Sequence, residues 1–127
     1  ANNVTLAGHV VVDSHAIIGG LTPVHQFTHI GSYVMVGGAS AINQDICPFV
    51  LAEGNKAVVR GLNTVGLRRR GFSDEELSNL KKVYRIIFRK GLPLKEALAE
   101  AEEQFGSDKN VAYLLEFIRN SERGIAR

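Results

Sequence analysis

The 127-residue sequence contains a single cysteine and no apolar run long enough for a membrane span. With Cys47 alone, a disulfide within the chain is excluded, and one thiol fits a reducing compartment. A spanning helix needs about 18 or more apolar residues, and no signal-peptide pattern opens the chain. A net charge of +2 argues against a general nucleic-acid binder. These absences predict a soluble, cytoplasmic protein of about one domain, with no membrane span and no nucleic-acid partner.

The most informative pattern that is present is a strict six-residue period between positions 4 and 48. A branched aliphatic residue recurs at every sixth position, and a small or β-branched residue lies two positions before each one. Neither a helix nor an alternating strand produces this spacing, whereas a parallel β-helix does. The sequence therefore predicts inward-pointing aliphatic positions at Leu6, Val12, Ile18, Val24, Ile30, Val36 and Ile42.

The period also predicts where the coils turn and where they stop. Gly8, Gly20 and Gly38 each lie two residues after an aliphatic position, where a tight corner leaves little room for a Cβ. Pro48 is expected to end the ladder, because proline has no N–H to donate to a further strand. Residues 49–52 then have the composition of one last strand.

The C-terminal half has the pattern of three helices that follow a connector. Ser73 and Glu76 have the spacing of a capping box, and apolar residues at helical spacing follow them. Three short amphipathic helices cannot bury their apolar faces alone, so they should pack together and against the β-helix. We expect three parts: a β-helix over 1–48, a connector with a basic loop over 49–72, and a three-helix domain over 73–127.

The four histidines all miss the inward positions, so each should lie on the surface. A zinc site is disfavoured, because no two histidines lie one coil apart on the same face and no carboxylate cluster accompanies them. His25 and Gln26 are adjacent and can hydrogen-bond sugar hydroxyls or an acyl carbonyl. Gly8, beside His9, can offer its backbone N–H to a developing oxyanion. We expect no metal and no cofactor.

The clearest basic cluster is Arg68-Arg69-Arg70, which lies between Gly66 and Gly71. It is either a solvated basic loop or a phosphate site, since arginine forks match phosphate oxygens. A position just before a helix would add the anion preference of a helix N-terminus. The spacing alone leaves both interpretations open. Cys47 precedes a proline and has no histidine beside it, so it is a weak candidate nucleophile.

Several segments together resemble one enzyme family across essentially the whole chain. They are Asn3–Val10, Ile17–Gly20, Val24–Phe27, Val36–Gly38, Gly61–Asn63, Gly66–Phe72 and Ser121–Gly124. In combination they resemble the acyl-[acyl-carrier-protein]–UDP-N-acetylglucosamine O-acyltransferases, the first enzymes of lipid A biosynthesis.

The resemblance implies a left-handed parallel β-helix followed by a small α-helical domain, assembled as a homotrimer with active sites between neighbouring copies. The implied reaction moves an (R)-3-hydroxyacyl chain from acyl carrier protein to the 3-hydroxyl of UDP-N-acetylglucosamine. Matched position by position, Gly8 corresponds to the oxyanion amide and Gly38 to the position that limits chain length. The other implied substrate contacts are His9, His25 and Gln26 for sugar and acyl groups, and Asn63, Arg69 and Arg70 for the nucleotide and phosphates.

Two departures from the family pattern bear on activity. The family has Lys-Arg-Arg where this chain has Arg68-Arg69-Arg70, which preserves the charge. The family's general-base histidine belongs to a His-Asp segment upstream of the matching region, and no histidine of this chain fits that motif. We therefore expect further coils before Ala1, and an isolated chain that lacks the general base and is inactive.

Two alternatives remain open at this point. One is a related hexapeptide transferase that acylates an amine of a nucleotide sugar. The other is a β-helix scaffold that trimerises without catalysis, which the missing base would allow. The Gly-Leu-Arg-Arg-Arg-Gly segment and the helical tail favour the O-acyltransferase.

Overall fold

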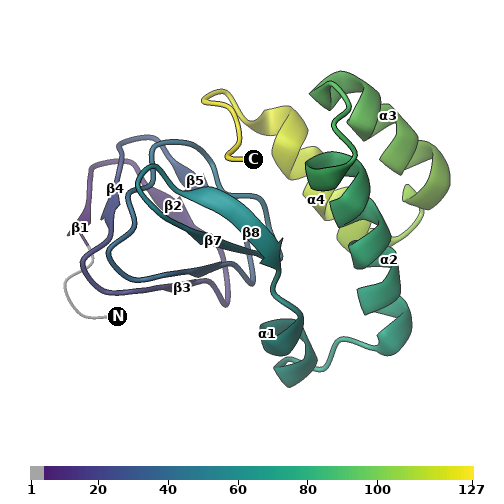
Figure 1. The fold of residues 1–127 in the computed structure, drawn as a ribbon, viewed down its shortest axis with the longest axis horizontal. Helices are drawn as coiled ribbons and strands as arrows, with labels where there is room; N and C mark the ends of the chain where they lie inside the picture. Colours follow the sequence, from purple (N-terminus) through teal and green to yellow (C-terminus); the bar gives the residue numbers. More distant parts are fainter. Residues whose placement is uncertain (1–4) are drawn as a thin grey trace.

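The computed structural model describes residues 5–127 and has a β part beside a helical part (Figure 1). Six two-residue strands stack into a triangular prism, and two longer strands close its C-terminal end. Four helices follow. The strands are β1 (Thr5–Leu6), β2 (Val11–Val12), β3 (Ile17–Ile18), β4 (Pro23–Val24), β5 (His29–Ile30), β6 (Met35–Val36), β7 (Val50–Glu53) and β8 (Val58–Leu62).

The strand register confirms the six-residue period. β1 pairs in parallel with β4, β2 with β5, and β3 with β6, so each strand lies beside the one three hexads later. Thr5 pairs with Pro23, for example, and Ile17 with Met35. Three hexads therefore make one coil of a parallel β-helix, with one sheet on each face of the prism.

The prism core is built from the predicted aliphatic positions. Five of them are buried and the first two are exposed, because no coil among residues 5–127 packs above Leu6 and Val12. Small residues two positions earlier fill the corners of the core, among them Thr28 and Val34. The buried aliphatic positions are Ile18, Val24, Ile30, Val36 and Ile42.

The period shortens after Ile42, and the ladder does not end at Pro48. Ile30 bridges to Ile46, and Val36 pairs with Ala52, so the last coil is two residues shorter than the others. β7 continues the third sheet in parallel with β6, and β8 returns antiparallel to it. The prediction that Pro48 stops the pairing is wrong, because the proline lies at a corner against Gly31, outside the ladder.

The corners also differ from the prediction. At the three corners where a glycine was expected, the residue with left-handed backbone lies one position later and is not a glycine. Stacking between successive coils offsets part of this backbone cost: His9 stacks on Phe27 at 5.1 Å, and His15 stacks on Tyr33 at 5.0 Å. The corner residues with positive φ are His9, His15, Leu21, Phe27, Tyr33 and Ala39.

The three predicted helices are present, and a fourth precedes them. The predicted capping box forms, because Ser73 and Glu76 each accept a hydrogen bond from the other's backbone N–H. The connector contains a short unpredicted helix, capped by Asn63. The helices are α1 (Thr64–Arg69), α2 (Asp74–Tyr84), which continues as a π-helical turn Arg85–Arg89, α3 (Leu94–Phe105) and α4 (Lys109–Asn120).

The helices pack on one another and on one side of the prism, as expected. Their shared core includes Leu80, Ile87 and Leu115, together with Cys47 and Phe49 from the last coil. Burial raises the pKa of the Cys47 thiol far above its usual range, which favours the protonated thiol over the nucleophilic thiolate. No helix in the described part is both long and apolar enough to cross a bilayer. Whether the three predicted parts are independent units stays a prediction.

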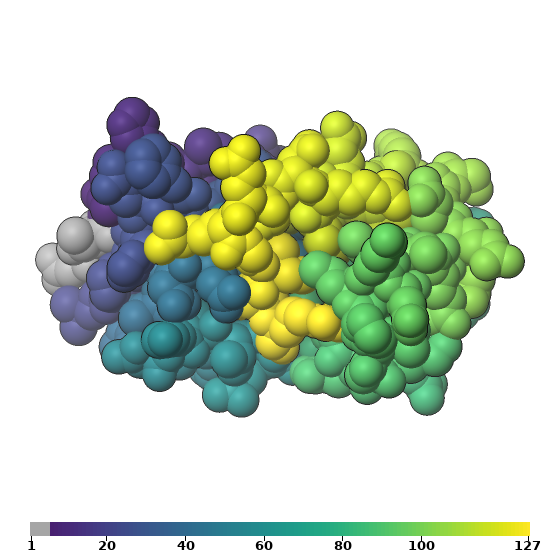
Figure 2. Space-filling model, turned by 90° about the horizontal axis from the view of Figure 1, so that it is seen from above, coloured from purple at the N-terminus to yellow at the C-terminus, as the bar shows by residue number. Residues whose placement is uncertain are grey.

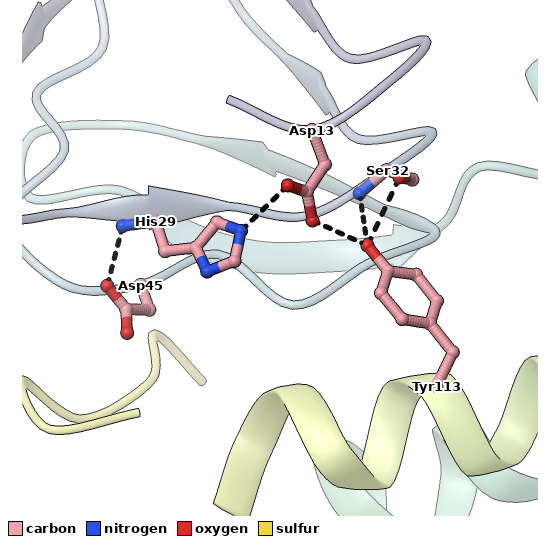
Figure 3. Close-up of polar contacts among 5 residues, drawn as sticks. All are labelled: Asp13, His29, Ser32, Asp45 and Tyr113. Atoms are coloured by element: carbon pink, nitrogen blue, oxygen red, sulfur yellow. Dashed lines mark hydrogen bonds and ion pairs between the residues drawn. The ribbon is translucent and has the colours of Figure 1, made fainter. Parts of the chain in front are cut away.

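Asp13 joins the prism to α4 (Figure 3). The Tyr113 hydroxyl donates to the Asp13 carboxylate at 2.7 Å and accepts from the Ser32 N–H at 3.0 Å. The His29 Nε2 lies 2.9 Å from the other carboxylate oxygen of Asp13. Burial, with a smaller contribution from Asp13, raises the pKa of the Tyr113 hydroxyl, so the phenol stays protonated and can donate.

Asp45 joins the prism to the segment that follows α4. Its carboxylate accepts from the His29 N–H at 2.8 Å and from the Ser121 hydroxyl at 2.6 Å. Its backbone forms a parallel bridge with Ile125. Figure 2 shows these last residues, in yellow, lying across the boundary between the prism and the green helices. The helical part is therefore fastened to the prism at two carboxylates.

We expect Gly31→Ala to lower the free energy of unfolding by about 1–3 kcal/mol, because the new Cβ would overpack a corner. It would lie 2.5 Å from the Pro48 nitrogen. Gly61→Ala is the matched control, because a Cβ there meets nothing within 4 Å. Urea denaturation of both variants measures the difference, and equal stabilities would contradict the packing of this corner.

We expect Tyr113→Phe to lower the free energy of unfolding by about 1–3 kcal/mol, because it removes a hydrogen-bond partner of both Asp13 and the Ser32 N–H. Tyr84→Phe is the control: the Tyr84 hydroxyl is buried with no partner among residues 5–127, so its removal should be neutral or stabilising.

The difference in free energy of unfolding between wild type and Tyr113→Phe should also depend on pH. A raised pKa means that the folded state favours the protonated Tyr113 phenol. Its contribution to the free energy of unfolding is therefore complete below pH 10.0, the ordinary pKa, and is lost as the pH rises through the raised pKa. Denaturation at pH 7 and at alkaline pH measures it, and an unchanged difference would contradict this prediction.

Candidate functional site

The residues predicted to carry chemistry fall into two groups at different places on the prism. Gly8 and His9 follow β1, and His25 and Gln26 follow β4. Because β1 pairs with β4, these four exposed residues share one corner, which we call the histidine corner. The stack of His9 on Phe27 lies at its edge, with the two rings only 10° from parallel.

The histidine corner is polar and open. Gly8 has nothing within 4 Å of the place where a Cβ would be, which leaves space beside its backbone. The His25 N–H donates to the Ile42 carbonyl at 2.9 Å, as part of the ladder. On its side chain, Nδ1 lies 3.2 Å from Nη2 of Arg123.

The second group begins with an apolar groove of about 380 Å³ on the face formed by β3, β6 and β7. Gly38 lies in this groove and is exposed. A Cβ at Gly38 would approach the Gly20 carbonyl oxygen to 3.3 Å, so a side chain here would lie close against the neighbouring coil. The residues that line it are Ile17, Gly19, Met35, Val36, Gly37, Gly38, Leu51, Ala52, Glu53 and Arg60.

A more polar cleft of about 340 Å³ adjoins the groove. Ile17 and Met35 line both hollows, so the two adjoin at these side chains. The cleft brings together three residues predicted as nucleotide contacts, Asn63, Arg69 and Arg70, with two ring-bearing residues that were not predicted, His15 and Tyr33. Its lining is His15, Ile17, Tyr33, Met35, Asn63, Val65, Gly66, Arg69 and Arg70.

Asn63 builds the wall of the cleft as well as lining it. Its side-chain oxygen accepts from the Gly66 N–H at 3.2 Å and so caps α1. Its side-chain nitrogen donates to the Tyr33 carbonyl at 2.9 Å. With only 8% of the residue exposed, Asn63 ties α1 to the corner that carries Tyr33.

The arginine run is the end of a helix and not a loop. Arg68 and Arg69 lie in the last turn of α1, and Arg70 caps it. The expected support from a helix N-terminus is therefore wrong, because the first turn of α2 carries Asp74 and two glutamates that repel an anion. The glycines on either side favour a loop, but the Asn63 cap stabilises a short helix instead.

The arginines in the cleft differ from their neighbour in how they are paired. Arg68 forms an ion pair with Asp74 at 3.2 Å. Arg69 and Arg70 are exposed, and within residues 5–127 neither forms an ion pair. Their guanidinium groups are therefore available to an anionic ligand in the cleft.

His15 and Tyr33 are the cleft residues that sequence reasoning missed. Both are corner residues, and they lie three hexads apart, so the coil period places one ring directly over the other. The Tyr33 ring also stacks on Phe49 at 5.9 Å and meets Phe72 edge-on at 5.0 Å. The same six-residue period, applied to the outward positions, is the sequence signal that pairs His15 with Tyr33.

The two hollows suit a ligand with two kinds of chemistry. The groove can bury a chain of methylene groups, and the cleft can bind an anion at two free guanidinium groups. No group of three or more His, Cys, Asp or Glu side chains in the described part of the chain is placed to hold a metal ion. The arrangement therefore indicates a site for an amphipathic or two-part ligand.

Comparison with known proteins identifies relatives along the whole chain. Residues 45–126 match the family described as UDP N-acetylglucosamine O-acyltransferase, domain 2. An acyl-[acyl-carrier-protein]–UDP-N-acetylglucosamine O-acyltransferase from Fusobacterium nucleatum is 75% identical over 90 residues, which cover 71% of this chain and 35% of that protein. One from Aliarcobacter butzleri is 54% identical over 127 residues, covering 98% of this chain and 48% of that protein.

Solved structures agree. The UDP-N-acetylglucosamine acyltransferase of Campylobacter jejuni is 46% identical, with a TM-score of 0.91 over 98% of this chain and 48% of that one. The Moraxella catarrhalis O-acyltransferase is 44% identical, with a TM-score of 0.94 over 99% and 49%. The chain thus spans about half the length of most of the relatives it matches. By family match, sequence identity and fold, this chain belongs to the UDP-N-acetylglucosamine O-acyltransferase family.

Proposed function

We propose that this chain carries the acyl-chain and nucleotide sites of an enzyme that transfers an (R)-3-hydroxyacyl group from acyl carrier protein to the 3-hydroxyl of UDP-N-acetylglucosamine, the first step of lipid A biosynthesis. The observation that carries the proposal is that the apolar groove and the arginine-bearing cleft adjoin at Ile17 and Met35. One hollow suits a fatty chain, and the other suits a nucleotide diphosphate.

The roles follow from the chemistry of each hollow. The acyl chain lies in the groove and ends near Gly38. The diphosphate is bound by Arg69 and Arg70, whose forks match phosphate oxygens, and Asn63 contacts the nucleotide. Acyl transfer from a thioester to a hydroxyl involves no change of oxidation state, so the proposed reaction needs no cofactor. The proposed partners are acyl carrier protein and UDP-N-acetylglucosamine, and the proposed location is the cytoplasm.

The histidine corner supplies the reacting end of the site. In the proposed complex, the Gly8 N–H stabilises the oxyanion, and His9 contacts the substrate. His25 and Gln26 bind the sugar and the acyl group. No histidine of this chain is assigned as the general base.

A single copy does not complete this site. The histidine corner lies between the face formed by β1 and β4 and the face formed by β2 and β5. The groove lies on the remaining face, which contains β3 and β6. We therefore propose a left-handed β-helix that assembles as a homotrimer, in which the histidine corner of one copy meets the groove and cleft of the next. Val11, Ile17 and Met35 support this assembly, because they leave apolar surface exposed on the prism faces.

We expect Arg70→Met to weaken binding of UDP-N-acetylglucosamine by about 10- to 100-fold, because a charge-assisted hydrogen bond to phosphate is lost. Arg68→Met is the matched control: it removes a neighbouring arginine that is paired with Asp74 and does not line the cleft. Isothermal titration calorimetry measures both. Equal weakening by the two variants would indicate a general charge effect and would contradict the cleft as the phosphate site.

We expect the enzyme, with glycine at position 38, to prefer long acyl chains, and Gly38→Met to shorten that preference. Each methylene group excluded from an apolar groove costs about 0.8 kcal/mol, so losing four changes the preference by more than about a hundredfold. A series of acyl carrier protein donors of increasing chain length, assayed on the complete enzyme, measures it. An unchanged preference would mean that Gly38 is only a corner glycine.

A further inference from the structure

We infer that Arg123 is a positioning residue that fixes the tautomer of His25, so that this histidine presents an N–H donor to the substrate. The role given to the substrate rests on the proposed function, whereas the tautomer itself does not. The two side chains are in contact: Nη2 of Arg123 lies 3.2 Å from Nδ1 of His25.

The chemistry of arginine decides which atom donates. A guanidinium group has five N–H donors and no acceptor, and it stays protonated in proteins. The His25 Nδ1 must therefore accept. An imidazole that accepts at Nδ1 is neutral and carries its proton on Nε2. The Nε2 of His25 therefore carries an N–H that can donate a hydrogen bond, and it has no free lone pair with which to accept one.

Arg123 is itself held in place. Its Nε donates to the Asn43 carbonyl at 2.6 Å, which leaves Nη2 to reach His25. The turn that carries Arg123 is fastened to Asp45, which is only 4% exposed. Asp45 accepts from the Ser121 hydroxyl at 2.6 Å and donates its N–H to the Gly124 carbonyl at 2.9 Å.

The segment after α4 therefore reaches back to the histidine corner. Gly124 adopts φ 90°, a left-handed conformation that turns the chain back toward the prism directly after Arg123. A hollow of about 350 Å³ separates this turn from the neighbouring prism surface at Phe27 and His29. The contact between Arg123 and His25 lies beside this hollow and connects the helical part with the residues proposed to bind substrate.

A defined tautomer limits what His25 can do. With the proton on Nε2, it donates to an oxygen acceptor, which in the proposed complex is a sugar hydroxyl or the acyl carbonyl. It cannot take a proton through that nitrogen. This agrees with His25 acting as a substrate contact, and it excludes His25 as the general base in this conformation.

The tautomer is measured directly on the chain by two-bond ¹H–¹⁵N correlation spectra of the imidazole groups at neutral pH. We expect His25 to show the pure Nε2–H pattern in wild type and a tautomer mixture in Arg123→Met. Arg119→Met is the matched control, because Arg119 lies on α4 and pairs with Glu102. A mixture in wild type, or no change in Arg123→Met, would overturn the inference.

Ligand binding by two His25 variants tests the assigned donor, and it distinguishes failure of the tautomer from failure of the proposed function. The terminal amide of His25→Gln places a donor near the Nε2 position, whereas that of His25→Asn places one near Nδ1. We expect His25→Asn to bind UDP-N-acetylglucosamine about three- to tenfold more weakly than His25→Gln. The reverse order would overturn the assigned donor. A pure Nε2–H pattern in a chain that binds no UDP-N-acetylglucosamine would support the tautomer and contradict the proposed function.

Discussion

Parallel pairing across three hexads is the constraint on which the rest of the structure depends. It places Thr5 beside Pro23 and Ile17 beside Met35, and by the same rule it sets corner residues of successive coils above one another. The stack of His15 on Tyr33 follows directly. A slip of one residue would turn the aliphatic ladder outward and would dismantle the core and the corners together.

This geometry divides the chemistry of the chain between two places. Residues that follow β1 and β4 meet at one corner, whereas those beside β3, β6 and β7 form the groove and the cleft. The helical part then contributes to both places. α1 brings Arg69 and Arg70 to the cleft, and the segment after α4 brings Arg123 to the histidine corner. Asp13 and Asp45 hold the helical part where both contributions are possible.

Sequence reasoning succeeded where one residue type repeats with a period, and it failed where contacts join distant segments. The buried ladder was predictable because each aliphatic position repeats the same environment. The shortened last coil was not, because its register depends on where Ile46 meets Ile30. α1 was missed because two glycines outweighed the Asn63 cap. The bond from Tyr113 to Asp13 joins residues with no shared pattern, so only the fold reveals it.

We propose that a complete substrate site needs two copies of the chain. The most direct measurement is complementation between an Arg70→Met variant and a His9→Ala/His25→Ala double variant, each weak in binding UDP-N-acetylglucosamine. In an assembly of both, one copy can supply the intact histidine corner and its neighbour the intact cleft. We expect co-expressed variants to recover wild-type affinity at a fraction of their sites. Binding no stronger than the average of the separate variants would contradict the shared site.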